Sequence, residues 1–338
     1  MERPKSRFWS RAFPDVKRLL LIAAAGLSLA AASPMGWRWS LPEGVATPPV
    51  PTDNALSVAK IELGRRLFYD ADLSADGTMS CASCHVQRHA FAESIATRGG
   101  VNGDAGRRNA PGLGNVAWLS PLTFADPAVT TLEVQVHTPI FGTHPVEMGM
   151  AAREPEIGQR LSQDACYRRM FDKAFPKSEG VITFTSVARA LASFERTMVS
   201  YGSDFDRGAL SVEARAGRGL FNRDCASCHA GPQFTDLSYH RLAPADVTGT
   251  DQGLFEATGI EADRGKFRTP SLRNVALTGP WWHDGSAATM DVALARHGLS
   301  HNARETAELV AFLRALSDHE FTERKSLSMP DRACGKRL

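Results

Sequence analysis

The sequence predicts a mainly α-helical protein made of two tandem halves, joined and covered by long irregular loops. No stretch shows the sustained alternation of apolar and polar residues that is typical of strands. Glycine and proline are dense between residues 98 and 155 and between 230 and 286, which indicates loops. Apolar residues instead recur at helical spacing, most clearly at Val187, Leu191, Phe194 and Met198 and again at Leu309, Phe312, Leu313 and Leu316.

The helix that carries the second apolar stripe has a recognisable start. Asn302 and Glu305 have the spacing of a capping box, in which each side chain accepts a hydrogen bond from the backbone of the other residue. We therefore expect a helix to begin at this point.

The second half of the chain repeats landmarks of the first half in the same order, which argues for a tandem duplication. Cys-Ala-Ser-Cys-His occurs twice, at 81–85 and at 225–229. The flanking landmarks that also match are 64–68 with 217–221, 111–117 with 270–276, and 131–134 with 289–292.

The repeated pentapeptide is the attachment sequence for c-type haem. Its two thiols form thioethers to one porphyrin, and the adjacent histidine binds the iron. The sequence thus predicts two covalently attached haem c groups in two cytochrome c-like domains, held by Cys81, Cys84 and His85 and by Cys225, Cys228 and His229. Zinc also binds Cys-x-x-Cys pairs, but it does not require a histidine at the same offset after both pairs.

Residues 1–33 are expected to be a signal peptide or an anchor, because a basic segment precedes the apolar run 19–32, which is short for a membrane span. Export to a periplasm follows, and a membrane is a partner only if this leader is uncleaved. The proline-rich residues 34–54 are expected to form an extended lead-in. Residues 55–205 and 206–338 are the two expected haem domains.

Charge and the remaining cysteines say less. The net charge is +2, and the first 32 residues hold six Lys or Arg against two acids. These first residues account for the whole positive net charge, so the rest of the chain is not basic and no nucleic-acid partner is suggested. Cys166 and Cys334 lie outside the haem motifs. An oxidising compartment allows them to pair, and two free thiols are the open alternative.

The two haems are not equivalent in the sequence. After the first motif the next histidine, His89, lies only four residues on, and residues 90–110 contain neither Met nor His. A haem that only transfers electrons has both axial positions filled, whereas one that reacts with peroxide needs an open position. The first haem is therefore expected to be five-coordinate.

Several motifs resemble the bacterial dihaem cytochrome c peroxidases and MauG, over about residues 52–318. The matching segments, in order around both haems, are 73–81, Arg108–Pro111, Leu132–Gln135, Val146–Met148 and Trp282–Gly285. The resemblance implies a peroxide-reactive first haem with Gln135 and Glu147 on its open side. Glu147 is then the general acid/base that moves a proton between the peroxide oxygens, and Gln135 orients the ligand. A solvated loop carboxylate is the alternative for Glu147, and His144 is a nearby competitor.

For the second haem, the resemblance implies a distal ligand shortly after the His-Asp-Gly motif. This position is His297, so a bis-histidine haem with His229 is expected, and its potential should be low. The competing ligands that stay open are Met290, His283 and His301.

Two departures from the family pattern matter. The chain lacks the histidine that blocks the first haem of the peroxidases, so it should react with peroxide while fully ferric, as MauG does. In place of the tryptophan between the haems it has Phe124, with Trp118, Trp281 and Trp282 as candidate substitutes. The family also implies a calcium ion held by Asn109, Thr278 and Pro280, whose oxygen atoms suit that ion.

Segments 51–56, 60–64 and 141–147 look most like the methanobactin-associated MauG-like enzymes. That likeness implies oxidation, by hydrogen peroxide and a ferryl haem, of Trp to kynurenine in an exported, copper-binding partner protein. One alternative is a peroxidase that takes electrons from a small cytochrome or cupredoxin. A second is a non-enzymatic electron-transfer cytochrome, which requires both haems to be six-coordinate.

Overall fold

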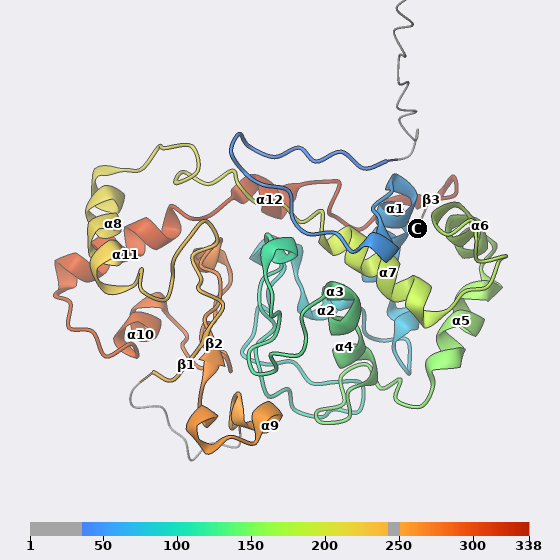
Figure 1. Ribbon diagram of the computed structural model, residues 1–338, viewed down its shortest axis with the longest axis horizontal. Coiled ribbons are helices and arrows are strands. Elements are labelled where there is room, and N and C mark those ends of the chain that lie inside the picture. Colours follow the sequence, from blue (N-terminus) through green and yellow to red (C-terminus); the bar gives the residue numbers. More distant parts are fainter. Residues whose placement is uncertain (1–35, 243–250, 338) are drawn as a thin grey trace, which may run out of the picture. The chain divides into compact units, whose positions relative to one another are not determined.

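Two long helices organise the amino-terminal half of the computed structural model, which describes residues 36–242 and 251–337. Helix α1 (Val58–Phe68) packs closely against α7 (Phe184–Glu195), at the right of Figure 1. A Cβ atom on Gly64 would lie 1.9 Å from the carbonyl oxygen of Ala190, so only glycine permits this approach.

Shorter elements fill the rest of this half. They are η1 (Thr52–Asn54), η2 (Ala71–Leu73), α2 (Cys81–Cys84), η3 (Gln87–His89), η4 (Val116–Trp118), α3 (Leu132–Gln135), α4 (His137–Phe141), α5 (Glu154–Gln163) and α6 (Ala165–Ala174). Of the residues predicted to act at the first haem, Cys81 and Cys84 lie in α2 and Gln135 in α3, whereas His85 and Glu147 lie in the loops between the elements.

The carboxyl-terminal half repeats the helix pair with α8 (Val212–Asp224) and α11 (Ala303–Arg314), at the left of Figure 1. Here a Cβ atom on Gly217 would lie 1.9 Å from the carbonyl oxygen of Glu308. Gly64 and Gly217 occupy the same place in the repeated landmark, so the close helix contact is repeated as well.

The remaining elements of this half are short. They are β1 (Tyr239–His240), α9 (Phe255–Thr258), η5 (Glu261–Asp263), β2 (Phe267–Arg268), η6 (Val275–Leu277), α10 (Met290–Ala295), α12 (His319–Glu323), β3 (Arg332–Ala333) and β4 (Lys336–Arg337). Strands β1 and β2 pair antiparallel, as do β3 and β4. The prediction of a mainly helical protein is confirmed for the described residues.

Helix starts follow the sequence. The Asn302 side chain accepts from the backbone N–H of Glu305, and the Glu305 carboxylate accepts from that of Asn302, so the predicted capping box is confirmed. Thr131 and Thr289 cap α3 and α10 in the same way as one another, each accepting a hydrogen bond from the N–H three residues later.

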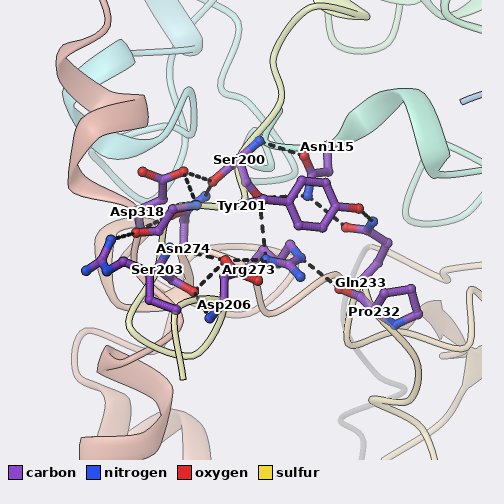
Figure 2. Close-up of polar contacts among 12 residues, drawn as sticks. Asn115, Ser200, Tyr201, Ser203, Asp206, Pro232, Gln233, Arg273, Asn274 and Asp318 are labelled. Atoms are coloured by element: carbon purple, nitrogen blue, oxygen red, sulfur yellow. Dashed lines mark hydrogen bonds and ion pairs between the residues drawn. The ribbon is translucent and has the colours of Figure 1, made fainter. Parts of the chain in front are cut away.

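A buried polar network joins the two halves (Figure 2). Asn115 and Asn274, equivalent residues of the repeat, both have positive φ, at 57° and 62°. The Asn115 side chain accepts from the Ser200 N–H at 2.7 Å, and the Asn274 side chain accepts from the Asp318 N–H at 2.8 Å. Asn274 also donates to the Ser200 hydroxyl, which ties one half to the other.

The described residues belong to one unit that spans residues 35–338, and the expected division between 205 and 206 stays a prediction. Cys166 and Cys334 form a disulfide, which decides between the two alternatives left open by the sequence. The expected signal or anchor segment lies outside the described residues. Within the described part of the chain, every helix is too short or too polar to cross a membrane.

Candidate functional site

In the second half, two histidines face one another across a cavity. His229 Nδ1 is 3.1 Å from the carbonyl oxygen of Phe234, and His297 Nδ1 is 2.8 Å from that of Ala293. Burial, with a smaller contribution from the nearby His297, lowers the pKa of His229 to about 4. An imidazole whose Nδ1–H donates to a carbonyl is oriented so that its Nε2 can bind a metal.

The cavity between these histidines has a volume of about 1160 Å³. Small-molecule pockets measure roughly 300–1,000 Å³, so this cavity is large enough for a group of the size of a porphyrin. Its wall includes Cys225, Cys228, His229, Met290 and His297. The pair of thiols beside one imidazole, with a second imidazole opposite, fits the requirements of a c-type haem with two nitrogen ligands.

The competing ligands are engaged differently. His301 Nε2 is 2.8 Å from the Asp224 carboxylate, and the His283 ring stacks on Phe267 with 3.7 Å between ring centres. Met290 is the first residue of α10 and also lines the cavity. Trp282, another lining residue, presents its ring to His297 at 5.5 Å in an edge-to-face contact. His297 is thus the predicted ligand that is both held by a carbonyl and close to His229.

In the first half, His85 is held as His229 is. Its Nδ1 is 2.8 Å from the carbonyl oxygen of Phe91. Each histidine has one acid that raises its pKa, Glu93 for His85 and Asp236 for His229, and only His229 also has a second imidazole, His297, that lowers it. Cys81 and Cys84 form the short helix α2 directly before this histidine.

Glu147 lies near the first attachment motif. Burial and the charges of Glu93 and Glu147 raise the pKa of the Cys84 thiol to about 12, which places both carboxylates within electrostatic range of Cys84. Burial alone raises the pKa of Glu147 itself. A carboxyl group that is buried without a cationic partner holds and releases a proton closer to neutral pH than an exposed one.

The backbone fixes the segment that carries Glu147. Its carbonyl oxygen accepts from the Val101 N–H at 2.8 Å, and the following residue, Met148, donates its N–H to Pro139 at 2.9 Å. A Cβ atom on Gly100 would collide with the carbonyl oxygen of Val146, so this loop contact also requires glycine. His144 is exposed, in agreement with a role in shaping the loop.

Gln135 is the last residue of α3 and is half-buried. Among the hydrogen bonds of the described residues, none joins its side chain to Glu147. Its neighbour Glu133 is the more strongly bound residue, since its carboxylate pairs with the buried Arg196 at 2.7 Å. Gln135 lies directly before α4, and Pro139 of α4 holds the Glu147 segment. The predicted role of Gln135 in orienting the ligand stays a proposal.

The predicted calcium ligands gather on one side of the cavity. Asn109, Thr278 and Pro280 all line it. The Asn109 amide group donates to the carbonyl oxygens of Ile95 and Ala96, and its backbone N–H donates to His283. Since these bonds use only N–H groups of Asn109, its side-chain oxygen is left to act as an acceptor or ligand.

Phe124 lines the cavity too, and its carbonyl oxygen accepts from the Arg268 N–H. Of the candidate substitutes for an inter-haem tryptophan, Trp281 and Trp282 are lining residues, and Trp281 donates its indole N–H to Val275. Trp118 instead follows the repeat Asn115 in η4 and contacts other aromatic rings.

Two buried acids were missed by the sequence interpretation. Glu93 is 1% exposed and pairs with Arg98 at 3.1 Å, beside Cys84. Glu195, at the end of α7, is 6% exposed, and burial raises its pKa to about 8. The only signal in the sequence was that Glu93 and Arg98 are five positions apart. An exposed ion pair on a loop can have the same spacing, so the sequence did not indicate that this pair is buried.

The helical fold, with two Cys-x-x-Cys-His segments whose histidines are each held by a backbone carbonyl, defines the class of dihaem c-type proteins. Residues 58–214 match the family model described as di-haem cytochrome c peroxidase. The chain belongs to this family, which also includes MauG. It is therefore a haem-dependent oxidoreductase that uses peroxide.

Three similar proteins illustrate the range of the family. Cytochrome c551 peroxidase of Nitrosomonas europaea is 33% identical, covering 89% of this chain and 92% of the relative. The methylamine utilization protein MauG of Methylorubrum extorquens is 34% identical, covering 82% and 83%. A crystal structure of a MauG-like protein associated with microbial copper homeostasis has a TM-score of 0.83 and 36% identity, covering 88% of this chain and all of that one.

Proposed function

We propose that this protein is a MauG-like enzyme that uses hydrogen peroxide to oxidise a partner protein. The observation that carries the proposal is the difference between its two histidine sites. His229 and His297 line one cavity, whereas the half-buried Glu147 lies within electrostatic range of Cys84 in the first motif. An open iron beside a proton-handling group is the arrangement that peroxide chemistry requires.

The haem groups supply the redox chemistry when bound, and the chain's own residues supply ligands and proton transfer. His85 would hold the iron of one haem, and His229 with His297 would hold the iron of the other. Glu147 takes the proton from the inner oxygen of peroxide and returns it to the outer oxygen, which leaves as water. Burial raises the pKa of Glu147, and no cation opposes this effect. The free energies of its carboxylate and of its protonated form are therefore closer near neutral pH than in an exposed glutamate, so the residue can both accept and return the proton.

The backbone hydrogen bonds that hold the Glu147 loop support the role of Glu147 in proton transfer. Three backbone hydrogen bonds around residues 147 and 148 fix the loop, so the carboxyl group is positioned before peroxide arrives. Gln135, at the end of α3, orients the bound peroxide or a water through its amide group.

The proposed substrate is an exported, copper-binding protein, in which a Trp side chain is oxidised to kynurenine. Support comes from the likeness to the MauG-like protein of copper homeostasis, which is 36% identical over nearly its whole length. We place the reaction in the periplasm, where haem c and the Cys166–Cys334 disulfide are both favoured. A calcium ion at Asn109, Thr278 and Pro280 belongs to the same proposal.

A second candidate is peroxide removal with electrons from a small cytochrome or cupredoxin. The 33% identity to a cytochrome c551 peroxidase favours it. Both candidates need the same open haem, so they differ only in the electron donor. The electron-transfer cytochrome without enzyme activity is excluded by membership of the family.

The test combines a spectrum with a product analysis. The ferric holoenzyme should show one high-spin and one low-spin haem by electron paramagnetic resonance, and two low-spin haems would contradict the proposal. Incubation with peroxide and the exported protein encoded beside this one should then convert a Trp in that protein, as mapped by mass spectrometry. An unmodified partner together with rapid oxidation of reduced cytochrome c would establish the peroxidase instead.

A further inference from the structure

Four aromatic side chains form a continuous file that the proposed function does not use. Ring centres are 6.0 Å apart for Trp37 and Trp39, 6.3 Å for Trp39 and Trp118, and 5.8 Å for Trp118 and Tyr201. Tryptophan and tyrosine are the side chains that are oxidised most readily by one electron without a metal. A file of such rings with short gaps therefore offers a route for electrons.

Tyr201, at the inner end of the file, lies beside Arg273 and Gln233 (Figure 2). Gln233 donates to the Tyr201 hydroxyl at 2.7 Å, and the carbonyl oxygen of the next residue, Phe234, holds His229. The guanidinium group of Arg273 lies 4.3 Å from the centre of the Tyr201 ring, and Arg273 itself lines the cavity. Tyr201 is thus connected to the His229 site by hydrogen bonds and one peptide unit.

The outer end of the file lies in the segment that precedes α1. Trp37 and Trp39 are half-buried and alternate with the exposed residues Gly36, Arg38 and Ser40. The Trp118 indole N–H donates to the carbonyl oxygen of Ala46 at 3.0 Å, which fastens this segment over Trp118. The file therefore runs from Tyr201, which contacts the cavity residue Arg273, to the protein surface.

The charged groups beside the four rings indicate the direction in which an electron vacancy would move along the file. The buried Arg273 opposes a positive charge on the Tyr201 ring, although Asp206, paired with it at 3.0 Å, reduces this effect. Among the cation–ring contacts of the described residues, none involves the three tryptophans of the file. An electron vacancy is accordingly more stable on Trp118, Trp39 and Trp37 than on Tyr201, so it moves outward.

We infer that Tyr201, Trp118, Trp39 and Trp37 form a relay that carries oxidising equivalents from the His229–His297 haem to the surface of residues 36–40. This inference rests on the proposed function, which supplies the oxidant. In every step, including those at Tyr201, one electron moves inward, so the ring that gives it becomes a radical cation and the ring that receives it returns to neutral. Tyr201 keeps its hydroxyl proton, because Gln233 donates to that oxygen and cannot accept the proton. The Trp118 N–H faces a carbonyl, and the buried Trp37 N–H has no hydrogen-bond partner, so neither indole gives its proton to a base.

The overall reaction balances through peroxide. One hydrogen peroxide takes up two electrons and two protons and yields two waters. With a reducing partner at the surface, that partner supplies both electrons. Without one, an outer tryptophan loses two electrons and two protons and adds the oxygen of a water, which gives hydroxytryptophan.

The experiment treats the holoenzyme with peroxide in the absence of any partner and maps oxidised residues by mass spectrometry, while the optical spectrum records the reaction of the haems. We expect hydroxytryptophan at Trp39 and Trp37. Trp118→Phe should abolish this product, and Trp118→Tyr, which keeps an oxidisable ring, should restore part of it. Tyr69→Phe, which removes a phenol outside the file, is the matched control and should leave the product in place.

The outcomes separate the two proposals. A spectral change with oxidation elsewhere, or with equal oxidation of Trp39 in the Trp118→Phe variant, overturns the relay and leaves the proposed function standing. No spectral change on adding peroxide overturns both, because the relay then has no oxidant. Loss of the product in Trp118→Phe with an unchanged spectral response supports the relay.

Discussion

The two halves of the molecule share a scaffold and differ on one side of each histidine site. Phe68 contacts Phe91 and Phe194 in the first half, with ring centres 5.9 and 5.5 Å apart. In the second half the corresponding rings are Phe221, Phe234 and Phe312, and Phe221 lies 5.9 and 5.0 Å from the other two. Phe91 and Phe234 also both have positive φ and supply the carbonyl that holds the histidine of their motif.

The segments expected on the other side of each haem, which follow Thr131 and Thr289, begin with equivalent helices and then differ. Thr131 and Thr289 cap equivalent helices, and His297 lies eight residues after Thr289. Eight residues after Thr131 is Pro139, which has no side chain able to bind iron. Its carbonyl oxygen instead accepts from Met148 and so anchors the loop of Glu147. The second half therefore has the proposed ligand His297 where the first half has Pro139 and the loop of Glu147, while the side that carries the attachment motif is alike in both.

The largest expected effect comes from removing the feature that only the second half has. His297→Ala should convert the low-spin haem of the ferric enzyme to high-spin, because one imidazole ligand is lost. Electron paramagnetic resonance measures the change. His301→Ala is the matched control, since this histidine pairs with Asp224 and should leave the low-spin signal intact. An unchanged signal in the first variant would reject His297 as the ligand.

The corresponding change in the first half removes its proton-handling group. Glu147→Gln keeps the size of the side chain, and we expect the reaction with peroxide to slow by about 10²–10⁴, the usual contribution of general acid–base catalysis. Stopped-flow absorbance measures the rate. The exposed Glu154→Gln on α5 serves as the control. A rate equal to that of the native enzyme would remove Glu147 from the mechanism.

The shared scaffold is tested at its closest contact. Gly217→Ala should destabilise the protein by about 1–3 kcal/mol or more, because the added Cβ atom meets the Glu308 carbonyl and the helices must separate. Gly219→Ala on the same helix meets nothing within 4 Å and should stabilise slightly. Gly64→Ala should resemble Gly217→Ala if the halves pack alike, and chemical denaturation compares all three variants.

The smallest effect expected is a pH dependence confined to the first half. Glu147 must begin as a carboxylate to accept the proton of peroxide, so the rate should fall as the pH is lowered through its pKa. Burial raises that pKa, and the midpoint should therefore lie above the ordinary glutamate value of 4.5. Rates measured between acid and neutral pH should show this limb in the native enzyme. The limb should be absent from Glu147→Gln, and its persistence there would assign it to another group.

Much of the fold was predictable because it depends on local patterns. Helical spacing, the Asn302–Glu305 capping box and the order of repeated landmarks all act over short distances along the chain. The family likeness also predicted His297 near His229, and both residues line one cavity, while their binding of one iron stays a prediction. The carbonyls of Phe91 and Phe234 were not predicted, because a positive φ at phenylalanine has no sequence signature.

Contacts between distant segments account for the rest. Glu93 is buried beside Cys84 only because the loop that follows the motif folds back, with the Glu93 N–H donating to Ala110. The network of Ser200 with Asn115 and Asn274 needs both halves in place before any of its hydrogen bonds exists. The spacing of these residues in the sequence contains no information about such meetings.

The Cys166–Cys334 bridge has a topological consequence. It closes residues 166–334 into a covalent ring, and the tail before Cys334 is bound to α1, where Tyr69 donates to Leu327 and Arg65 to Ser328. A single protease cut at any loop inside this ring leaves both fragments attached to one another. Such nicked enzyme should run as one band in a non-reducing gel and as two bands after reduction, whatever becomes of the haems.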